Sequence, residues 1–484
     1  MSTAGGWVTA RKDNNTAVKV LLINPPAWGT VQGNNPSFID RERGFNPPLG
    51  LLYVASAAQA EGHRIEVVDC QAEQIGYRKL GRVLVSRTPD VVGIHAMTLT
   101  LPDVIRTASM VKTILPAVPV VLGGPHTIFY QAETLSHSSI DILVRGEGEN
   151  TFTHLLEHLQ NNVDLSSVRG ISFKHRGKIV TTPDQELCSD LNSLPFPARK
   201  LTPVARYRSV IARHSPITTM VTSRGCPYRC TFCSRPHLGK EFRARSAANV
   251  VDEMEVCRKL GIPEILIYDD TFTVQPDRVA DICREIRRRK LDVTFDIRAR
   301  VDTISASMLH DLKQAGCDRI HYGVEAGNDR MMEAIGKSIT VAQAKKAFEM
   351  TRETGISTLA YFMVGLPGQK QADLDDTWEL IKRINPDYLH LTMLSPFPGS
   401  AVFAQGIKQG IFTDFWRDFV LKPEPGYQTP YWKEHLSRED LLQFMAAVYR
   451  KFYMTPRRVI REMGNIRRLP SKIKAGLSML MNPN

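Results

Sequence analysis

The feature that most constrains the fold of this chain is an alternation of short apolar runs with helical segments, which occurs twice along its length. In the first series the apolar runs are rich in Val, Ile and Leu and end at Asn, Asp, Gly or Pro. Strands that alternate with helices are typical of a parallel sheet covered on both faces. We expect strands near 18–24, 64–70, 90–97, 118–126 and 142–149, and helices near 48–63, 74–86 and 102–114. This pattern predicts a doubly wound, Rossmann-like α/β domain that binds ligands at the carboxyl ends of its strands.

The second series has six apolar runs, each followed by a helix or a loop. The strands are expected at 217–223, 264–270, 293–300, 319–327, 357–367 and 387–394. The helices between them are expected at 246–261, 276–289, 305–316, 341–355 and 373–384, with a further helix near 437–453 beyond the last strand. The series therefore predicts a second parallel sheet, with function again at the carboxyl ends of its strands.

Length and composition set the organisation of the chain. At 484 residues it is too long for one ordinary core, and 43% hydrophobic residues suffice for large cores. The net charge of +12 favours contact with anions, such as phosphorylated cofactors or an anionic membrane. We see neither a secretory signal nor a long apolar run, which predicts a cytoplasmic protein. We expect a flexible leader over 1–17, α/β domains over 18–195 and 196–400, and a small, mostly helical region over 401–484.

Three cysteines lie in one predicted loop. Cys226, Cys230 and Cys233 follow the first strand of the second series with the spacing Cys-x3-Cys-x2-Cys. Three thiolates can each bind one iron of a cubane cluster, which leaves the fourth iron open to a substrate or a cofactor. An odd number of cysteines argues against a disulfide framework. Structural zinc needs four ligands and would recruit His237, so zinc is the alternative.

Phe232, immediately before the third cysteine, favours the iron–sulfur interpretation. With this aromatic residue the loop resembles that of the radical S-adenosylmethionine (SAM) enzymes. The resemblance implies a partial triosephosphate-isomerase-type barrel and a [4Fe-4S] cluster on the three cysteines. It also implies that SAM binds the open iron and that an external electron donor, such as flavodoxin or ferredoxin, reduces the cluster. SAM would then be cleaved to a 5′-deoxyadenosyl radical that removes hydrogen from an unactivated carbon.

Residues at the ends of the later strands match the cofactor pocket of that family. The resemblance implies that an aspartate pair after the second strand meets the amino group of SAM and that an arginine after the third grips its carboxylate. A glutamate after the fourth strand would contact the ribose, and a turn with Gly and Pro after the fifth would lie near the adenine, as would Phe232. In this sequence these residues are Asp269, Asp270, Arg300, Glu325, Gly365 and Pro367.

The first series resembles the cobalamin-binding domain that precedes the barrel in many of these enzymes. Such domains carry a small hydroxyl residue after the third strand and Gly-Gly after the fourth. Other cobalamin domains have a cobalt-binding histidine after the second strand, where this chain has Gln71. The resemblance therefore implies cobalamin without a lower histidine ligand. The residues expected around it are Asn24, Pro25, Gln71, Thr98, Gly123, Gly124 and Glu147.

Together these features resemble the cobalamin-dependent radical SAM group, which includes C-methyltransferases and the anaerobic magnesium-protoporphyrin ester cyclase. We expect methylation of an unactivated carbon in a small-molecule or lipid-like substrate. The alternatives are an oxidative cyclase or rearrangement enzyme with the same cofactors, and a non-enzymatic cobalamin sensor. The basic segment 456–484 predicts contact with an anionic membrane. No recognition fold accompanies its charge, so we expect no nucleic acid as a partner.

Overall fold

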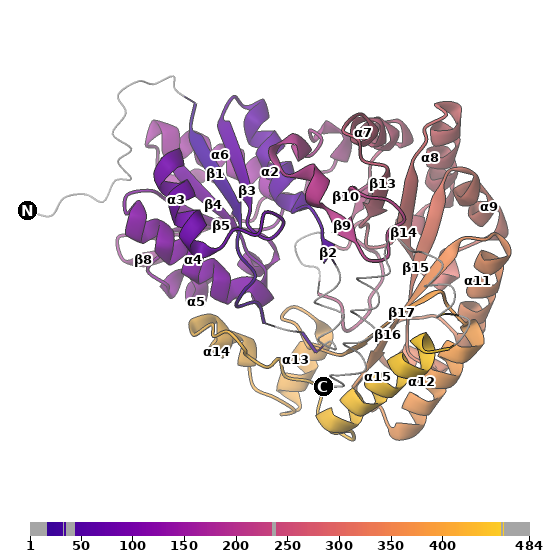
Figure 1. Cartoon of the computed structure of the whole chain (residues 1–484). Coiled ribbons are helices and arrows are strands. Elements are labelled where there is room, and N and C mark those ends of the chain that lie inside the picture. Colours follow the sequence, from indigo (N-terminus) through magenta and orange to yellow (C-terminus); the bar gives the residue numbers. More distant parts are fainter. Residues whose placement is uncertain (1–16, 32, 35–43, 235–238, 456–457, 459–484) are drawn as a thin grey trace, which may run out of the picture.

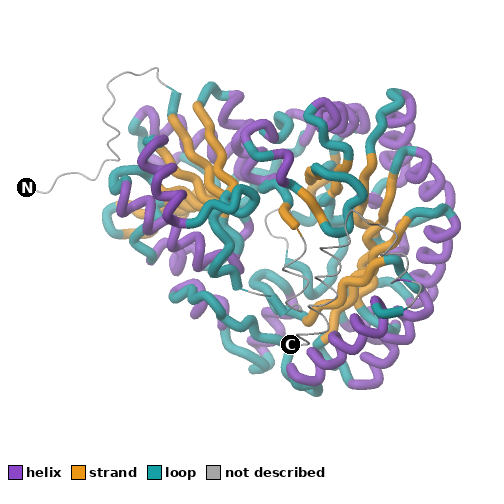
Figure 2. Tube along the Cα trace, in the orientation of Figure 1, coloured by secondary structure: helices purple, strands orange, loops and turns teal. Residues whose placement is uncertain are grey.

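The computed structural model describes residues 17–31, 33–34, 44–234, 239–455 and 458. Figure 1 shows two α/β units side by side, with the helical C-terminal region running along their lower edge. In Figure 2 the strands of each unit form one sheet, and helices line the outer face of the second sheet. Among the described residues, no helix is both long and apolar enough to cross a membrane.

The N-terminal unit contains a seven-stranded sheet with the order β3-β1-β4-β5-β6-β7-β8. The strands from β3 to β6 in this order run parallel, as the sequence predicts. The last two strands form an antiparallel hairpin that the sequence pattern did not predict. The strands are β1 (Lys19–Asn24), β3 (Arg64–Asp69), β4 (Val91–His95), β5 (Val120–Gly123), β6 (Ile142–Val144), β7 (Ile171–His175) and β8 (Lys178–Thr181).

Helices cover both faces of this sheet because its central strands are apolar on both sides. Along β1, Val20 and Leu22 pack against α2 (Leu49–Ala60) and α6 (Gly148–Asn161). The alternate residues Leu21 and Ile23 pack on the other face. That face is covered by α3 (Tyr77–Arg87), α4 (Leu101–Ile114) and α5 (Gln131–Ser136).

The strand predicted over 142–149 is shorter in the structure. β6 ends at Val144, and Gly146 turns the chain with a φ of +72°. Helix α6 then begins at Gly148, so the end of the predicted strand is the start of a helix. Glycine adopts a positive φ without the steric cost that other residues meet.

The second unit contains a six-stranded parallel sheet with the order β10-β13-β14-β15-β16-β17. All six predicted strands are present, which confirms the partial barrel. They are β10 (Ile217–Met220), β13 (Glu264–Ile267), β14 (Thr294–Ala299), β15 (Cys317–Glu325), β16 (Ser357–Val364) and β17 (Tyr388–Met393). The helices are α7 (Ala247–Lys259), α8 (Pro276–Arg288), α9 (Ala306–Gln314), α10 (Asp329–Ala334), α11 (Val341–Glu353) and α12 (Gln371–Ile384).

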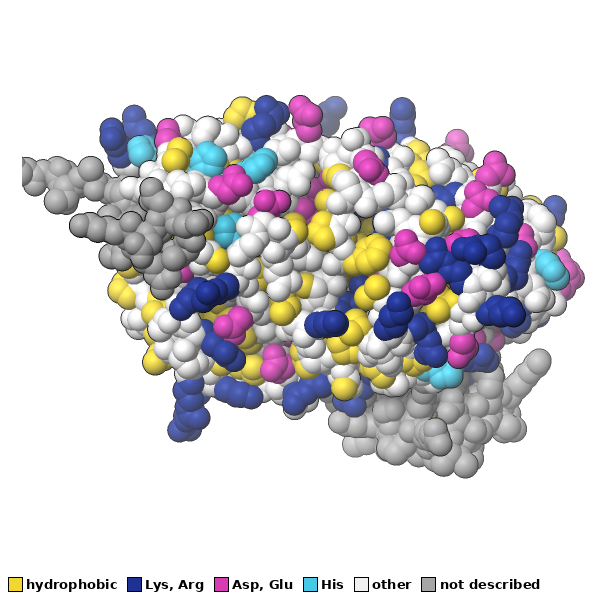
Figure 3. All heavy atoms as spheres, turned by 90° about the horizontal axis from the view of Figure 1, so that it is seen from above, with side chains coloured by type: hydrophobic (Ala, Val, Ile, Leu, Met, Phe, Trp, Pro, Cys, Tyr) yellow, Lys and Arg dark blue, Asp and Glu magenta, His cyan; other side chains and the backbone are white. Residues whose placement is uncertain are grey.

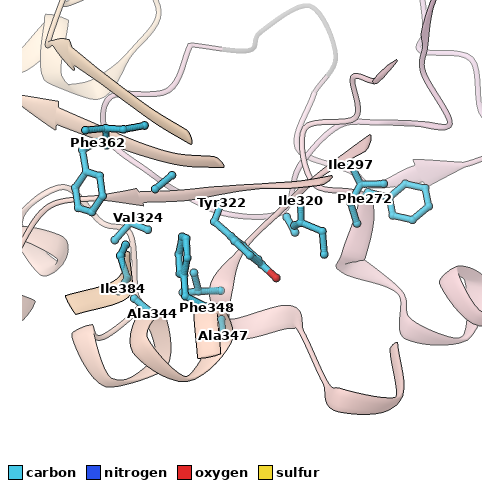
Figure 4. Packing of buried hydrophobic residues seen from close by; sticks show 14 of the residues in the cluster. Phe272, Ile297, Ile320, Tyr322, Val324, Ala344, Ala347, Phe348, Phe362 and Ile384 are labelled. Carbon is cyan, nitrogen blue, oxygen red and sulfur yellow. The ribbon is translucent and has the colours of Figure 1, made fainter. Parts of the chain in front are cut away.

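The barrel core lies between this sheet and its helices. Figure 4 shows Ile320, Tyr322 and Val324 of β15 pointing to the side from which Phe348 of α11 also comes. The Tyr322 ring lies 5.0 Å from that of Phe348, and its hydroxyl is 2.8 Å from the Thr351 hydroxyl. Side chains alternate across a strand, so His321 and Glu325 of β15 face the other, concave side. The strand thereby places apolar residues in the core and polar residues on the concave face.

Part of the surface charge forms ion pairs. On the face shown in Figure 3, Lys and Arg side chains lie among Asp and Glu side chains. Arg288 pairs with Glu285 on helix α8, and Arg289, which caps α8, pairs with Asp252 of α7. The predicted membrane-binding segment 456–484 lies outside the described residues except for Arg458, which donates to Asn385 and to the Pro386 carbonyl.

The C-terminal region completes the cores of both units. Helix α13 (Ala401–Lys408) contributes Val402 to the barrel core and Phe403 to the N-terminal core. Helix α14 (Phe415–Leu421) packs on the N-terminal unit, and α15 (Arg438–Tyr453) packs on the barrel. α15 lies where the sequence predicts a helix, and Ser437 and Asp440 form the capping turn at its start.

Helix α15 also supplies hydrogen-bond partners to the backbone at the exposed edge of the barrel sheet. β17 is the last strand of that sheet, so one side of its backbone has no neighbouring strand. The Tyr449 hydroxyl accepts from the Leu391 N–H at 2.7 Å and donates to the Leu391 carbonyl at 2.9 Å. The Tyr453 hydroxyl does the same with Leu389, at 3.0 and 3.1 Å. Two tyrosines one helical turn apart thus replace a missing strand.

We expect Tyr449→Phe and Tyr453→Phe each to weaken the local stability of β17 by about 1–3 kcal/mol, because a backbone donor and acceptor lose their partner. Hydrogen exchange at the amides of Leu389 and Leu391 measures this change. Gln443→Ala, on the exposed side of the same helix, is the control and should change exchange by less than about 0.5 kcal/mol. Unchanged exchange in both tyrosine variants would show that the edge is held by other contacts.

Candidate functional site

A two-stranded ladder closes the loop that carries the three clustered cysteines. β11 (Ser223–Arg224) pairs in antiparallel register with β12 (Arg243–Ala244), and we call residues 225–242 between them the cysteine loop. β11 follows directly on the carboxyl end of β10. The described part of the loop, residues 225–234 and 239–242, therefore begins and ends at the carboxyl edge of the barrel sheet, where ligands bind in barrels of this type.

Within the loop the three cysteines differ in exposure. Cys226 is buried, and its sulfur lies 3.8 Å from the Thr271 hydroxyl. Cys230 and Cys233 are partly exposed, and the Cys233 N–H donates to the Cys230 carbonyl. Among the described residues, no three His, Cys, Asp or Glu side chains are arranged to hold one metal ion. His237, the fourth ligand in the zinc alternative, lies outside the described residues.

Asp269 fixes the chain segment that leads into the cysteine loop. One carboxylate oxygen accepts from the Thr222 N–H at 2.6 Å. The other accepts from the hydroxyls of Thr222 at 2.5 Å and Ser223 at 2.6 Å. Asp269 is 1% exposed, so these bonds form in a dry environment. The carboxylate thus sets the direction in which the chain leaves β10. The next residue, Asp270, is partly buried on the same turn.

Arg300 connects the end of β14 to the cysteine loop. Its guanidinium makes two parallel hydrogen bonds with Asp302, at 2.9 and 3.0 Å, and donates to the Lys337 carbonyl at 2.7 Å. It also lies 3.8 Å above the ring centroid of Tyr228, which belongs to the loop. Arg300 is 4% exposed, so its guanidinium makes these contacts in the interior and not at the surface.

Glu325 stands at the end of β15 in a strained conformation. Its φ is +74°, and the pairing register with β16 shifts between Gly323 and Glu325. Non-glycine residues with positive φ cluster at functional sites, and bulges redirect side chains there. The Glu325 carboxylate accepts from the Lys337 ammonium at 3.0 Å. This ammonium also lies 6.0 Å from the ring centroid of Phe232 in the cysteine loop.

Lys337 is a site residue that the sequence motifs missed. It is 6% exposed, and it contacts Glu325 through its side chain and Arg300 through its carbonyl. It belongs to the short turn after α10, a helix that the sequence pattern did not predict. No local signal distinguishes this lysine from a solvated one, because its importance arises only from the packing of the turn.

The turn after β16 is held by a buried amide. Gly365 has a φ of +73°, and its N–H donates to the Gln369 side-chain oxygen at 2.6 Å. The Leu366 N–H donates to the same oxygen at 3.2 Å. Gln369 is 2% exposed. The turn that carries Pro367, predicted near the adenine of SAM, thus has a fixed shape at the carboxyl edge of the sheet.

At the corresponding edge of the N-terminal sheet, Asp69 binds two loops together. It accepts from the Asn24 side chain at 2.8 Å and from the backbone N–H of Gln71 at 3.2 Å. It also accepts from the Tyr207 hydroxyl at 2.9 Å, a contact that the sequence did not predict. The Gln71 side chain donates to the Pro25 carbonyl at 3.2 Å. This places Asn24, Pro25 and Gln71 together, as the resemblance implies.

Thr98 follows β4 and Gly123 ends β5, so a hydroxyl group and an open surface lie at the same edge of the sheet. The Thr98 hydroxyl lies 3.2 Å from His126 Nδ1, and His126 Nε2 lies 3.0 Å from the Thr134 hydroxyl. Burial lowers the pKa of His126 to about 4, so the ring is neutral and orients Thr98 without adding charge. A Cβ on Gly123 would meet nothing within 4 Å, whereas one on Gly124 would lie 2.7 Å from the Ala96 carbonyl oxygen.

Glu147, predicted beside cobalamin, is engaged with the barrel. Its two oxygens contact Arg224 at 3.1 Å and Arg243 at 2.9 and 3.1 Å. Glu149 contacts Arg224 at 2.5 Å. The cofactor role expected for Glu147 stays a prediction, and its partners in the structure are the two arginines that flank the cysteine loop.

Known proteins are similar to this chain in sequence and in fold. Residues 41–156 match the B12 binding domain, and residues 220–381 match the Radical SAM superfamily. An uncharacterized methyltransferase of Pyrococcus horikoshii is 32% identical over 92% of this chain and 94% of that protein. The anaerobic magnesium-protoporphyrin IX monomethyl ester cyclase of Rubrivivax gelatinosus is 29% identical over 84% of this chain and 74% of that protein.

Among solved structures, the radical SAM methyltransferase TsrM of Kitasatospora setae superposes with a TM-score of 0.66 at 19% identity, covering 82% of this chain and 79% of that one. This likeness supports the observed fold. The two domain matches and the nearly full-length relative assign the family. The chain belongs to the cobalamin-binding radical SAM enzymes, whose cofactors are SAM, a [4Fe-4S] cluster and cobalamin.

Proposed function

We propose that this enzyme transfers a methyl group to an unactivated carbon of a small-molecule or lipid-like substrate. The observation that carries the proposal is the similarity, over 92% of this chain, to the uncharacterized methyltransferase of Pyrococcus horikoshii. Bound together, the cofactors supply a 5′-deoxyadenosyl radical and a transferable methyl group. The family assignment makes the chain an enzyme and leaves no place for the cobalamin sensor alternative. An external electron donor such as flavodoxin or ferredoxin belongs to the same proposal.

For the cluster and SAM, the proposal assigns distinct tasks to residues of the barrel. Cys226, Cys230 and Cys233 would hold three irons, a donor set that fits a cubane with one open position. Asp269 would fix the loop entrance through Thr222 and Ser223 rather than bind SAM directly, because both of its oxygens already accept hydrogen bonds from these two residues. The remaining pocket residues would be Phe232, Asp270, Arg300, Glu325, Gly365 and Pro367, as the resemblance implies.

For cobalamin, the proposal rests on the carboxyl edge of the N-terminal sheet. Gln71 stands where a cobalt-binding histidine would be, and its amide group donates to the Pro25 carbonyl. The open surface over Gly123 fits the close approach of a large planar ligand. Thr98, oriented by His126, would donate or accept a hydrogen bond at the same edge. Asn24, Gly124 and Glu147 complete the set that the resemblance implies.

A second function has a specific observation in its favour. The cyclase of Rubrivivax gelatinosus is also similar over most of this chain, and an oxidative cyclase would use the same cofactors. Membrane contact through segment 456–484 stays a prediction that is independent of this choice.

A labelled methyl group separates the two functions. We expect that the reduced holoenzyme, incubated with SAM labelled in its methyl group and a small-molecule extract, yields a product heavier by one labelled CH2 unit. Mass spectrometry of the extract detects it. A product that lacks the label and has lost hydrogen or gained oxygen would overturn methyl transfer in favour of the cyclase.

Each of Cys226→Ala, Cys230→Ala and Cys233→Ala should abolish the formation of 5′-deoxyadenosine from SAM. The reason is that a cluster missing one thiolate ligand is not held with its open iron at the pocket. The measurement is 5′-deoxyadenosine release under anaerobic reducing conditions, together with the iron content. Cys283→Ala, in the barrel core on α8, is the matched control and should retain both. Retained release in a loop variant would contradict the cluster assignment.

Gly123→Leu should prevent cobalamin binding and leave the fold unchanged, because the added side chain enters space that the protein does not fill. The measurement is the cobalamin absorbance retained after gel filtration, with the iron content as an internal standard. Gly50→Leu is the control, since a Cβ there also meets nothing within 4 Å and the residue is exposed on α2. Full cobalamin retention by Gly123→Leu would place the cofactor elsewhere.

A further inference from the structure

Two glutamates of the N-terminal unit hold both ends of the cysteine loop. Arg224 of β11 pairs with Glu147 and Glu149, and Arg243 of β12 pairs with Glu147. The four side chains are between 5% and 8% exposed. They lie in contact across the junction of the two units, and we call them the loop clamp. Neither the cofactor motifs nor the family assignment gives these four residues such a role.

The loop clamp is close along the chain to the first cysteine and close in the sheet to the predicted cobalamin surface. Arg224 and Arg243 face each other in the ladder that closes the cysteine loop, and Arg224 is two residues from Cys226. On the other side, Glu147 follows the end of β6, where Val144 pairs with Gly123. A nearly direct path therefore runs from the predicted cobalamin surface through the clamp to the first cysteine.

The clamp favours one arrangement of its four side chains, because all of them are charged and buried. Burial would raise the pKa of Glu147, but the hydrogen bond from Arg243 and the charge of Arg224 outweigh it and hold the pKa below its usual value. The glutamate is therefore ionised and fully paired at neutral pH. A further bond, from the Cys188 N–H at 2.7 Å, fixes its orientation. Buried charges tolerate little displacement from their partners, because an unpaired charge in a dry environment is costly.

We propose that Glu147 and Glu149 are positioning residues that set the distance between the cysteine loop and the cobalamin edge. A reaction that uses two cofactors in one turnover requires this distance to be constant, because small displacements of the reacting groups slow the reaction. This inference rests on the two cofactors of the family and not on which product forms. It therefore holds for a methyltransferase and for a cyclase alike.

The test measures the geometry between the cofactors directly. Reconstituted protein with a reduced cluster and cob(II)alamin carries two unpaired spins, and their magnetic interaction in the electron paramagnetic resonance spectrum depends on the distance between them. The variants are Glu147→Gln, Glu149→Gln and the double variant, each checked for iron and cobalamin content. We expect a well-defined interaction in the parent protein and its broadening or loss in the double variant. An unchanged interaction in the double variant overturns the proposal.

A matched control separates the clamp from the loss of any carboxylate in the same region. Asp184 pairs with Arg145, also at the end of β6, and its side chain is 84% exposed. No contact joins it to the described part of the cysteine loop, residues 225–234 and 239–242. Asp184→Asn should leave the magnetic interaction unchanged. If Asp184→Asn has the same effect as the double variant, the effect does not come from the clamp and the proposal fails.

A second measurement covers the case in which the double variant does not retain its cofactors. Hydrogen exchange of the protein without cofactors reports the freedom of the loop ends. We expect the β11 and β12 amides to exchange faster by about tenfold or more in the double variant, with the exchange of β15 unchanged. Equal rates at β11 and β12 in variant and parent would overturn the proposal. Faster exchange throughout the barrel would show a general loss of stability and would also overturn it.

Discussion

The arrangement of the two units depends on a buried ion-pair network between their sheets. Arg224 follows the first barrel strand, Glu147 follows β6 of the N-terminal sheet, and their contact joins the carboxyl edges of the two sheets. In a parallel sheet the ligand-binding loops lie at the carboxyl edge, because every strand ends on the same side. The proposed sites of the two cofactors are thereby placed on either side of a contact that neither unit could keep buried alone.

Around this junction, the polar residues at the strand ends act on the loops beside them. Asp269 holds the entrance of the cysteine loop, and Arg300 lies against Tyr228 within it. Glu325 keeps a strained backbone, and its partner Lys337 approaches Phe232. A site whose ligand-binding loops are fixed before the ligand arrives loses less free energy to ordering when it binds. The structure therefore presents loops whose shape is fixed by contacts with the strand ends rather than a set of separate motifs.

The alternation of strands and helices was predictable because it is a local pattern with a short period. The β7–β8 hairpin and helix α6 were not predicted. The apolar run ends at Val144, and Gly146, with a φ of +72°, turns the chain into α6 within the predicted strand 142–149. At the site, motif residues could be named from the sequence, but their partners could not. His126 contacts Thr98 from 28 residues away, and Lys337 contacts Glu325 from 12 residues away. Tyr207 contacts Asp69, which in turn binds Asn24 and Gln71, from 138 residues away. No local pattern marks these partners.

The central claim is that one chain holds a cluster and cobalamin at adjoining sheet edges. Anaerobic reconstitution with iron, sulfide and hydroxocobalamin, followed by a visible absorption spectrum of the purified protein, tests it most directly. The account predicts that the spectrum contains both the broad iron–sulfur absorption and the bands of cobalamin, with cluster and cobalamin in equal amounts. A spectrum with the cluster alone, or with cobalamin alone, would contradict it.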